Sequence, residues 1–305
     1  MQQEEFIWPQ KYRPKTVAGT IIPDELKRAF QKFVDDKNVP HLLLSGGAGI
    51  GKTTVAMAML EEIGADYIVI NGSLDRNIDT LRTDIKSFAS TVSFNGGRKY
   101  VILDEADYLN PQSLQPALRN FMEHYSKNCG FILTCNFPNN IIQPLHSRVS
   151  HIEFKIGKED RPKIAAKFFK RVCEILDAEN IEYDKKAVAE VVQFYFPDFR
   201  RTLNELQRYS STGRIDVGIL SNKSQENITA LIDKMKEKNF TFVRKWVADN
   251  SEIDSASLYR MLYDVLPERA DSKQSIANGI LILAEYQYKE AFVANVEINR
   301  VAALV

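Results

Sequence analysis

Short continuous apolar runs recur along the first half of the chain, each followed by glycine or polar residues. They occupy residues 41–45, 67–70, 99–103 and 130–135. Runs of this length without alternation are typical of strands buried on both faces of a parallel sheet. After the first run the sequence predicts a helix over 53–63, closed by Gly64, which can adopt the positive φ that ends many helices. Strands that alternate with helices indicate an α/β fold, a three-layer arrangement that binds ligands at the carboxyl ends of its parallel strands.

The pattern becomes helical after one more strand, expected at 150–154. Apolar residues at helical spacing predict three amphipathic helices, over 158–177, 184–196 and 200–209. A polar stretch near 210–224 then marks a boundary. The remainder, 225–305, has helical apolar spacing and no group of catalytic side chains, so it predicts a helical, core-forming domain.

The composition and net charge limit the class of protein but do not by themselves indicate a binding partner. The chain has 305 residues, with 40 Lys and Arg against 40 Asp and Glu, so any nucleic-acid surface must be local. The first residues lack the basic and apolar regions of a signal peptide, and no apolar run has the length of a membrane span. Cys129, Cys135 and Cys173 have no C-x-x-C spacing and predict neither a disulfide framework nor a zinc site. We therefore expect a protein of the reducing cytoplasm with no membrane partner.

Residues 46–53 read Gly-Gly-Ala-Gly-Ile-Gly-Lys-Thr, a complete G-x-x-x-x-G-K-[ST] phosphate-binding motif between a predicted strand and a predicted helix. The glycines let successive backbone N–H groups turn toward an anion at the positive end of the helix. The alternative, a plain glycine turn, leaves the order of strand, loop and helix unexplained. We therefore predict a nucleoside triphosphate site with Mg²⁺ that comprises Gly47, Ala48, Gly49, Ile50, Gly51, Lys52, Thr53 and Thr54.

An acidic pair, Asp104 and Glu105, ends the third apolar run. Carboxylates at the end of a buried strand are costly unless they serve a cation or a reacting water. We predict that Asp104 binds Mg²⁺ together with Thr53 and that Glu105 polarises the attacking water. Asn136 ends the fourth run, and we predict that it touches the γ-phosphate and orients that water. The alternatives are an acidic helix start for the pair and a turn-starting asparagine for the strand end.

Further segments carry a family resemblance. They are Trp-Pro-Gln-Lys-Tyr-Arg-Pro at 8–14, Asn-Gly-Ser-Leu-Asp-Arg-Asn-Ile-Asp-Thr-Leu-Arg at 71–82, Thr-Cys-Asn at 134–136, Leu-His-Ser-Arg at 145–148 and Pro-Asp-Phe-Arg-Arg-Thr-Leu-Asn at 197–204. In this order they resemble the AAA+ clamp-loader ATPases, in the branch of replication factor C and the bacteriophage proteins. The sequence around Asp198 is most similar to that of the large subunits of phage clamp loaders. Val149 stands where the family usually has cysteine, a change that we expect to affect packing only.

The resemblance implies roles for residues of the ATP site. The residues expected near the adenine are Pro9, Gln10, Lys11, Tyr12 and Ile21. Arg148 would be an arginine finger offered to the ATP of a neighbouring subunit, and Arg200 would touch the γ-phosphate of its own ATP. From local sequence alone, Arg148 could instead be a surface residue, and Arg201 could take the place of Arg200.

The resemblance also implies three domains and a ring of subunits. The expected domains are an AAA+ nucleotide-binding domain over 1–155, a helical lid over 156–213 and an all-α collar over 214–305 that holds the ring together. Two helix starts would face DNA inside the ring, with contacts from Arg76, Asn77, Arg82, Gln115 and Arg119. Spacing alone favours ordinary solvated helix faces. Pro116 leaves open whether the second helix starts near 112–113 or is kinked.

Together these features predict an ATPase subunit of a sliding-clamp loader, which opens a clamp and places it on primer–template DNA during replication. The expected partners are primer–template DNA, the sliding clamp, other copies of the chain and a distinct small subunit. The expected location is the cytoplasm, which for a phage-encoded protein is that of the host cell. Two rivals stay open: another AAA+ DNA-remodelling ATPase, such as a helicase loader or branch-migration motor, and a subunit that binds nucleotide only as scaffold. The Lys-Tyr-Arg-Pro and Ser-Arg segments argue against the first, and Glu105 argues against the second.

Overall fold

The computed structural model describes residues 6–73, 78–93, 96–211, 213–215, 225–251, 253, 255–270, 272–290 and 292–305, apart from the side chains of 78–82, 225–227, 256, 257 and 268. The chain divides into two compact units, residues 1–216 and 217–305. Each unit has its own hydrophobic core, so each is described by itself.

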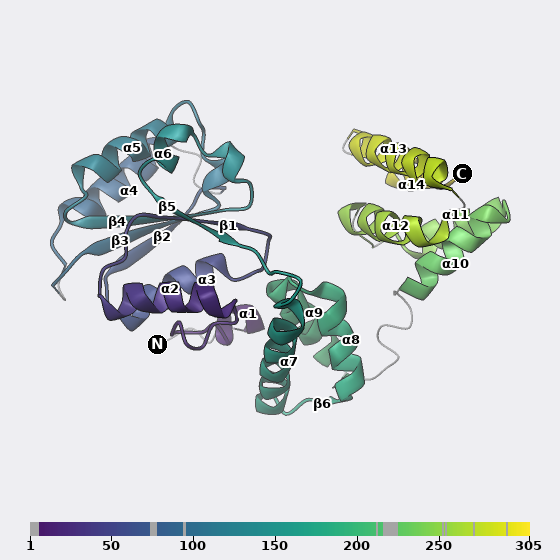
Figure 1. The fold of residues 1–305 in the computed structure, drawn as a ribbon, viewed down its shortest axis with the longest axis horizontal. Coiled ribbons are helices and arrows are strands. Elements are labelled where there is room, and N and C mark those ends of the chain that lie inside the picture. Colours follow the sequence, from purple (N-terminus) through teal and green to yellow (C-terminus); the bar gives the residue numbers. More distant parts are fainter. Residues whose placement is uncertain are drawn as a thin grey trace. The chain divides into compact units, whose positions relative to one another are not determined.

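The first unit is built on a five-stranded parallel sheet with strand order β2-β3-β4-β1-β5 (Figure 1). The strands are β1 (Leu42–Gly46), β2 (Tyr67–Asn71), β3 (Lys99–Asp104), β4 (Cys129–Cys135) and β5 (Ser150–Phe154). Because β3, β4 and β1 are neighbours, their carboxyl ends meet at one edge of the sheet. The residues that follow these three strands are thereby brought together. The expected parallel sheet is confirmed.

Helices cover both faces of this sheet, because successive strand residues point to opposite sides. On one face, α2 (Asp24–Asp35) and α3 (Lys52–Glu62) share a core with Leu42 and Leu44. On the other, α4 (Ile78–Ser90) and α5 (Leu114–His124) share a core with Leu43. Figure 1 shows these two helical layers on either side of the strands. The short elements are α1 (Trp8–Lys11), η1 (Ala106–Tyr108), η2 (Pro138–Asn140) and α6 (Gln143–His146).

The start of α5 answers the question that Pro116 left open. The helix begins at Leu114, directly after Ser113, so Pro116 lies in its first turn. The N–H groups of a first turn have no partner within the helix, and a proline there removes no helical hydrogen bond. The helix therefore starts next to the predicted position.

Three helices follow the sheet within the first unit: α7 (Arg161–Ala178), α8 (Lys185–Tyr195) and α9 (Phe199–Ser210). Two short parallel strands, β6 (Glu182–Tyr183) and β7 (Arg214–Ile215), join the end of α7 to the chain after α9. Aspartates cap two of the helices, since Asp184 accepts from the N–H of Lys186 and Asp198 from that of Arg201. The three predicted lid helices are present, with ends that differ by up to three residues.

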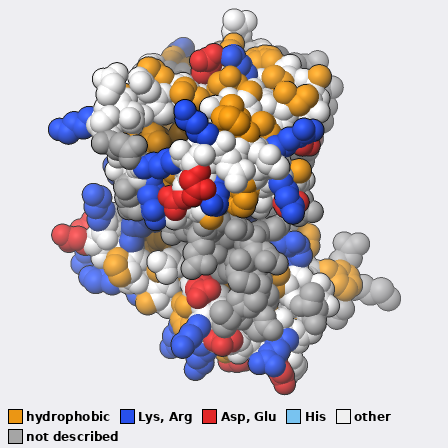
Figure 2. Space-filling view, turned by 90° about the vertical axis from the view of Figure 1, so that its right-hand side faces the viewer, with side chains coloured by type: hydrophobic (Ala, Val, Ile, Leu, Met, Phe, Trp, Pro, Cys, Tyr) orange, Lys and Arg blue, Asp and Glu red, His pale blue; other side chains and the backbone are white. Residues whose placement is uncertain are grey.

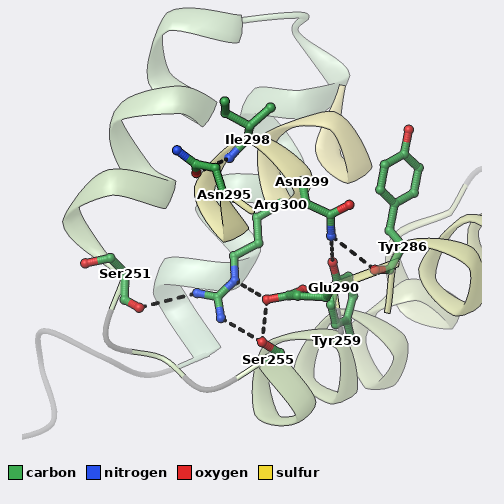
Figure 3. A network of polar contacts seen from close by, with 9 residues as sticks. All are labelled: Ser251, Ser255, Tyr259, Tyr286, Glu290, Asn295, Ile298, Asn299 and Arg300. Carbon is green, nitrogen blue, oxygen red and sulfur yellow. Dashed lines mark hydrogen bonds and ion pairs between the residues drawn. The ribbon is translucent and has the colours of Figure 1, made fainter. Parts of the chain in front are cut away.

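The second unit consists, in its described part, of helices α10 (Gln225–Lys236), α11 (Phe240–Asp249), α12 (Ser255–Arg269), α13 (Lys273–Glu290) and α14 (Val296–Leu304). Its apolar core includes Leu231, Trp246 and Leu262. A buried polar network also joins the last three helices (Figure 3). There Arg300 of α14 pairs at 2.9 Å with Glu290 of α13, and each side chain is only 5% exposed. Arg300 also donates to Ser255 of α12 at 3.0 Å.

Exposed apolar side chains are numerous on the second unit. Hydrophobic side chains gather on the upper part of the face that Figure 2 shows. The large exposed hydrophobic side chains of this unit include Ile280, Leu281, Ile282, Tyr288, Phe292 and Ile298. No helix in the described ranges combines the length and apolar character of a membrane span. Exposed apolar surfaces of this kind are typical of interaction sites.

Candidate active site

The phosphate-binding motif connects β1 to α3 at the carboxyl edge of the sheet. Two of its glycines are required by what surrounds them. Gly46 has φ +150°, and a Cβ there would lie 2.8 Å from the carbonyl oxygen of Phe154 on β5. Gly49 has φ +67°, and a Cβ there would lie 1.7 Å from Oδ1 of Asp198 in the lid region. The loop therefore packs against both the sheet and the helix that carries Arg200.

Lys52, at the start of α3, has its ammonium group at the centre of the site. Its Nζ donates to the carbonyl oxygens of Gly46 at 2.8 Å and Gly47 at 2.7 Å, and to Oδ1 of Asn136 at 2.8 Å. Only 8% of the residue is exposed, and burial lowers the pKa of Lys52. The contact with Asn136 joins the carboxyl ends of β1 and β4. The structure thus brings the predicted lysine and asparagine together.

Asp104 receives two hydroxyl groups at the end of β3. Thr53 Oγ1 donates to its Oδ1 at 2.6 Å, and Thr134 Oγ1 donates to the same oxygen at 2.5 Å. Sequence reasoning missed Thr134 as a site residue, although a polar residue inside the apolar run of β4 was a usable signal. The Thr134 hydroxyl fixes the Asp104 carboxylate beside Thr53.

The donor set at Asp104 suits magnesium. Hydroxyl and carboxylate oxygens are ligands that Mg²⁺ prefers, usually with substrate phosphates and water as the remaining ligands. Among the described residues, no group of three or more His, Cys, Asp or Glu side chains could hold a metal ion. Thr53 and Asp104 supply one hydroxyl and one carboxylate, which fits an ion that takes its other ligands from a nucleotide and water.

Glu105 follows Asp104 with a backbone that few residues adopt. Its φ of +55° and ψ of +44° lie in the left-handed region, which disfavours a residue with a Cβ. The N–H of Glu105 donates to Thr134 Oγ1 at 3.2 Å, which helps to hold this conformation. Such conformations concentrate at functional sites, where surrounding contacts enforce them. The side chain is half-buried at the same sheet edge as Asn136.

Asp107 is a second residue that sequence reasoning missed. Its Oδ2 accepts the backbone N–H groups of Asn136 and Phe137, both at 3.0 Å, and so fixes the turn that carries Asn136. Its Oδ1 is buried and has no hydrogen-bond partner among the described residues. Asp107 follows the acidic pair in the sequence Asp-Glu-Ala-Asp at 104–107. Its proximity to the pair indicated a site residue, but the spacing did not predict that it would hold the turn at Asn136.

A cavity of about 450 Å³ lies beside the loop, within the first unit. The predicted nucleotide-site residues that line it are Pro9, Gln10, Tyr12, Ile21, Gly49, Ile50, Gly51, Lys52, Thr53, Thr54 and Arg200. Gly47, Ala48 and Lys11 do not line it. Lys11 instead pairs through Nζ with Glu179 at 2.6 Å, and Tyr12 donates to the same carboxylate at 2.5 Å. The cavity is large enough for a ligand of nucleotide size.

The lid region reaches the loop through the start of α9. The N–H of Phe199 donates to the carbonyl oxygen of Gly49 at 3.1 Å, directly after the Asp198 cap. Arg200 lines the cavity, whereas the guanidinium carbon of Arg201 lies 5.0 Å from the centre of the Tyr195 ring. The two adjacent arginines therefore occupy different surroundings, and Arg200 is the one beside the nucleotide-sized space.

Arg148 lies away from this cavity, after α6, and is held by its own chain. Its Nε donates to Oε1 of Glu123 at 2.9 Å, and its Nη2 pairs with the same oxygen. Its Nη1 donates to the carbonyl oxygen of Pro144 at 2.6 Å and to Ser147 Oγ at 3.0 Å. Glu123 was not identified from the sequence.

The structure corrects one of the predicted DNA contacts. Gln115 is 0% exposed, because its amide nitrogen donates to the carbonyl oxygens of Leu109 and Asn140 and its oxygen accepts from Ile142. Both N–H donors of its amide are used, so none is left for a phosphate oxygen. Arg119 is exposed on the same helix. Arg76 and Asn77 lie outside the described residues, as does the side chain of Arg82.

Comparison with known proteins agrees with this geometry. Residues 42–158 match the model of the AAA family, "ATPase family associated with various cellular activities". Residues 160–221 match the model of the sliding-clamp-loader large subunit, AAA+ ATPase lid domain. The AAA+ fold with a helical lid, expected from the sequence, is confirmed.

Curated relatives give the same result over most of the chain. The sliding-clamp-loader large subunit of Escherichia phage RB69 is 40% identical and covers 82% of this chain and 81% of its own length. That of Enterobacteria phage T4 is 36% identical, with coverage of 98% and 94%. The replication factor C small subunit of Saccharolobus solfataricus is 36% identical, with coverage of 79% and 74%. Among solved structures, the Thermotoga maritima RuvB Holliday junction branch migration motor has a TM-score of 0.54 at 18% identity over 68% of this chain and 70% of that one. At that identity the likeness concerns the fold alone.

Proposed function

Because the chain belongs to the clamp-loader family of AAA+ ATPases, it is an ATPase subunit of a clamp loader in DNA replication, and we propose that it cleaves magnesium-bound ATP at a seam between neighbouring subunits. One observation carries the proposal. Lys52, Asp104 and Asn136, from three adjacent strand ends, meet beside a cavity that both the loop and the lid helices line. This arrangement has the parts that phosphoryl transfer needs: phosphate ligands, oxygens for Mg²⁺ and a carboxylate base.

Each residue then has a separate task. The backbone N–H groups of the loop and Lys52 hold the phosphates, and Thr53 and Asp104 hold Mg²⁺, which neutralises developing charge on the phosphoryl oxygens when bound. Glu105 accepts a proton from the attacking water as the water oxygen bonds to the γ-phosphorus, while the bond from that phosphorus to the β–γ bridging oxygen breaks and ADP leaves. Asn136 orients that water, and Asp107 keeps Asn136 in place through its backbone.

The two arginines act on different nucleotides. Arg200 lines the cavity, so it contacts the γ-phosphate of its own subunit's ATP. Arg148 does not line the cavity, and we assign its guanidinium to the ATP of an adjoining subunit because its Leu-His-Ser-Arg segment matches the family's arginine-finger motif. An arginine supplied in this way stabilises the charge of the transferring phosphoryl group.

The rest of the chain supports an assembly around DNA. We assign residues 1–155 to nucleotide binding, 156–213 to the lid and 214–305 to a collar whose exposed apolar side chains bury against other subunits. Arg119, with Arg76, Asn77 and Arg82, contacts the phosphates of primer–template DNA. The other partners are the sliding clamp, further copies of the chain and a distinct small subunit, in the cytoplasm of the phage host.

The test is turnover by the assembled loader with and without primer–template DNA and clamp. We expect DNA with clamp to stimulate hydrolysis, and Glu105→Gln to lower the stimulated kcat by about 10²- to 10⁴-fold while ATP still binds. Glu237→Gln, on the surface of the second unit, is the control. Unchanged turnover in Glu105→Gln would remove the assigned base. Stronger stimulation by a four-way DNA junction than by primer–template with clamp would favour a branch-migration motor.

A further inference from the structure

The Arg148 guanidinium is almost fully engaged within its own subunit. A guanidinium has five N–H donors in a planar fork. Two of them, on Nε and Nη2, point to Oε1 of Glu123 on α5, and the two on Nη1 point to the carbonyl oxygen of Pro144 and the hydroxyl of Ser147. One N–H on Nη2 is left. The edge of the fork that would grip a phosphate in a bidentate manner is therefore occupied by a carboxylate.

The paired Arg148 differs in charge as well as in geometry from an arginine finger that contacts a phosphate. A finger lowers the barrier because its positive charge meets the negative charge that develops on the phosphoryl oxygens. Beside the Glu123 carboxylate much of that positive charge is already neutralised. Arg148 must leave Glu123 before it can serve a neighbouring ATP with its full charge and its free edge.

We propose that Glu123 is a positioning residue that holds Arg148 against its own subunit and so restrains hydrolysis within the assembly until the guanidinium moves to the next subunit's phosphate. The proposal rests on the finger role given to Arg148 above. The pair can act in this way because it is accessible: the Arg148 side chain is 26% exposed and that of Glu123 51%. Exposed pairs are weak, so competition by a phosphate can break this one.

Glu123 has a second cationic neighbour that can pair with it after Arg148 has left. Arg119 lies one helical turn earlier on α5, with its Nε 3.7 Å from the same Oε1 atom. When Arg148 departs, Arg119 can take over the carboxylate, which lowers the cost of separating the first pair. Glu123 therefore keeps a nearby cation after Arg148 departs, as long as Arg119 is not engaged by a DNA phosphate.

The experiment measures ATP hydrolysis by the assembled loader without DNA or clamp, at an ionic strength of about 0.05 M. We expect Glu123→Gln to raise kcat about two- to fivefold, the range in which exposed ion pairs act, with KM for ATP within about twofold of the original. Glu123→Asp keeps the charge and should stay near the original rate. Glu237→Gln is the matched control, since Glu237 is 56% exposed and pairs with Lys234 at 2.6 Å.

A double variant separates this proposal from the finger assignment. Arg148→Ala should lower kcat strongly, and Glu123→Gln should have no effect when Arg148 is already alanine. If Arg148→Ala lowers kcat but Glu123→Gln leaves it unchanged or lowers it, Glu123 does not restrain the finger and the finger role survives. If Arg148→Ala leaves kcat unchanged, both assignments fall.

Discussion

The chain contains two arginine–glutamate pairs whose chemistry is the same and whose surroundings are opposite. Arg148 and Glu123 pair on the surface of the first unit, with side chains 26% and 51% exposed. Arg300 and Glu290 pair inside the second unit, where both side chains are 5% exposed (Figure 3). Water competes for the first pair and is excluded from the second. The first pair is therefore suited to being exchanged, and the second to holding three helices together.

The buried pair of Arg300 and Glu290 requires hydrogen-bond partners, because a buried polar atom without one destabilises the fold. Glu290 Oε1 receives Arg300 Nε and the Ser255 hydroxyl, whereas its Oε2 is buried with no hydrogen-bond partner among the described residues. Asn299, the neighbour of Arg300, donates to the Tyr286 carbonyl oxygen at 3.1 Å and extends the network to another turn of α13. Removal of one member leaves a charge without compensation in the interior.

The largest expected effect is on the stability of the second unit. Arg300→Met should lower its free energy of unfolding by about 3–5 kcal/mol, because Glu290 is left buried without a cation. The chain has two tryptophans, Trp8 in the first unit and Trp246 in the second, so Trp246 fluorescence in a Trp8→Phe background reports on the second unit during denaturant unfolding.

Two further variants sharpen this comparison. Arg148→Met, followed through Trp8 in a Trp246→Phe background, should change stability by less than about 1 kcal/mol. Replacing both members of the buried pair, as Glu290→Leu with Arg300→Met, should cost less than Arg300→Met alone. Equal losses at the two arginines would show that burial does not distinguish the pairs.

Acid should weaken the buried pair by a smaller amount. Burial by itself raises the pKa of Glu290, but the neighbouring Ser255, Tyr259 and Arg300 outweigh it and lower that pKa below its ordinary value of 4.5. The folded state therefore holds this proton less tightly than the unfolded chain does. The stabilisation is fully present above the unfolded pKa and is lost as the pH falls through the folded one.

Denaturant unfolding of the second unit between pH 7 and pH 3, followed by Trp246, checks this dependence. Stability should decline below about pH 4.5, and the decline should be shallower in Glu290→Gln, which has no proton to bind at this position. The Arg148 hydrogen bond also lowers the pKa of Glu123, but that carboxylate is solvated, so Glu123→Gln should change little the pH slope of the first unit, followed through Trp8 in a Trp246→Phe background. An equally steep decline in Glu290→Gln would assign the acid effect to other carboxylates.

Salt should produce the smallest change and the clearest contrast. Raising the ionic strength from about 0.05 M to about 1 M shortens the Debye length to roughly 3 Å, which screens exposed charges and hardly reaches buried ones. At high salt, kcat of the Glu123→Gln variant should then become nearly equal to that of the original protein. The stability loss from Arg300→Met should stay within about 0.5 kcal/mol of its low-salt value. A salt-independent effect of Glu123→Gln would mean that charge is not what holds Arg148.

Much of the first unit follows from its sequence pattern. Strands buried on both faces need continuous apolar runs, and the run at 130–135 gives β4, in which every residue from Cys129 to Cys135 is buried. The phosphate loop could be placed because its glycine spacing, a preceding strand and a following helix all had to agree. The residues that hold these parts in position were harder to find, since Thr134, Asp107 and Glu123 act through contacts between segments distant in the sequence.

Gln115 shows where reasoning from resemblance went against a local signal. It lies three residues before Leu118 and seven before Met122, so helical spacing places it on the buried side of α5 with those residues. A polar residue on that side needs hydrogen-bond partners from the protein, and Gln115 finds three. Attention to helical spacing would have assigned it to the interior.

Gly49 has a consequence for anyone who moves this loop between proteins. The general motif leaves its position open to any residue, yet here Asp198 occupies the space that a side chain would need. A graft that carries residues 46–53 without the matching turn at 196–200 would transfer a loop shaped for a neighbour that is absent. Loop and turn are best treated as one transplantable module.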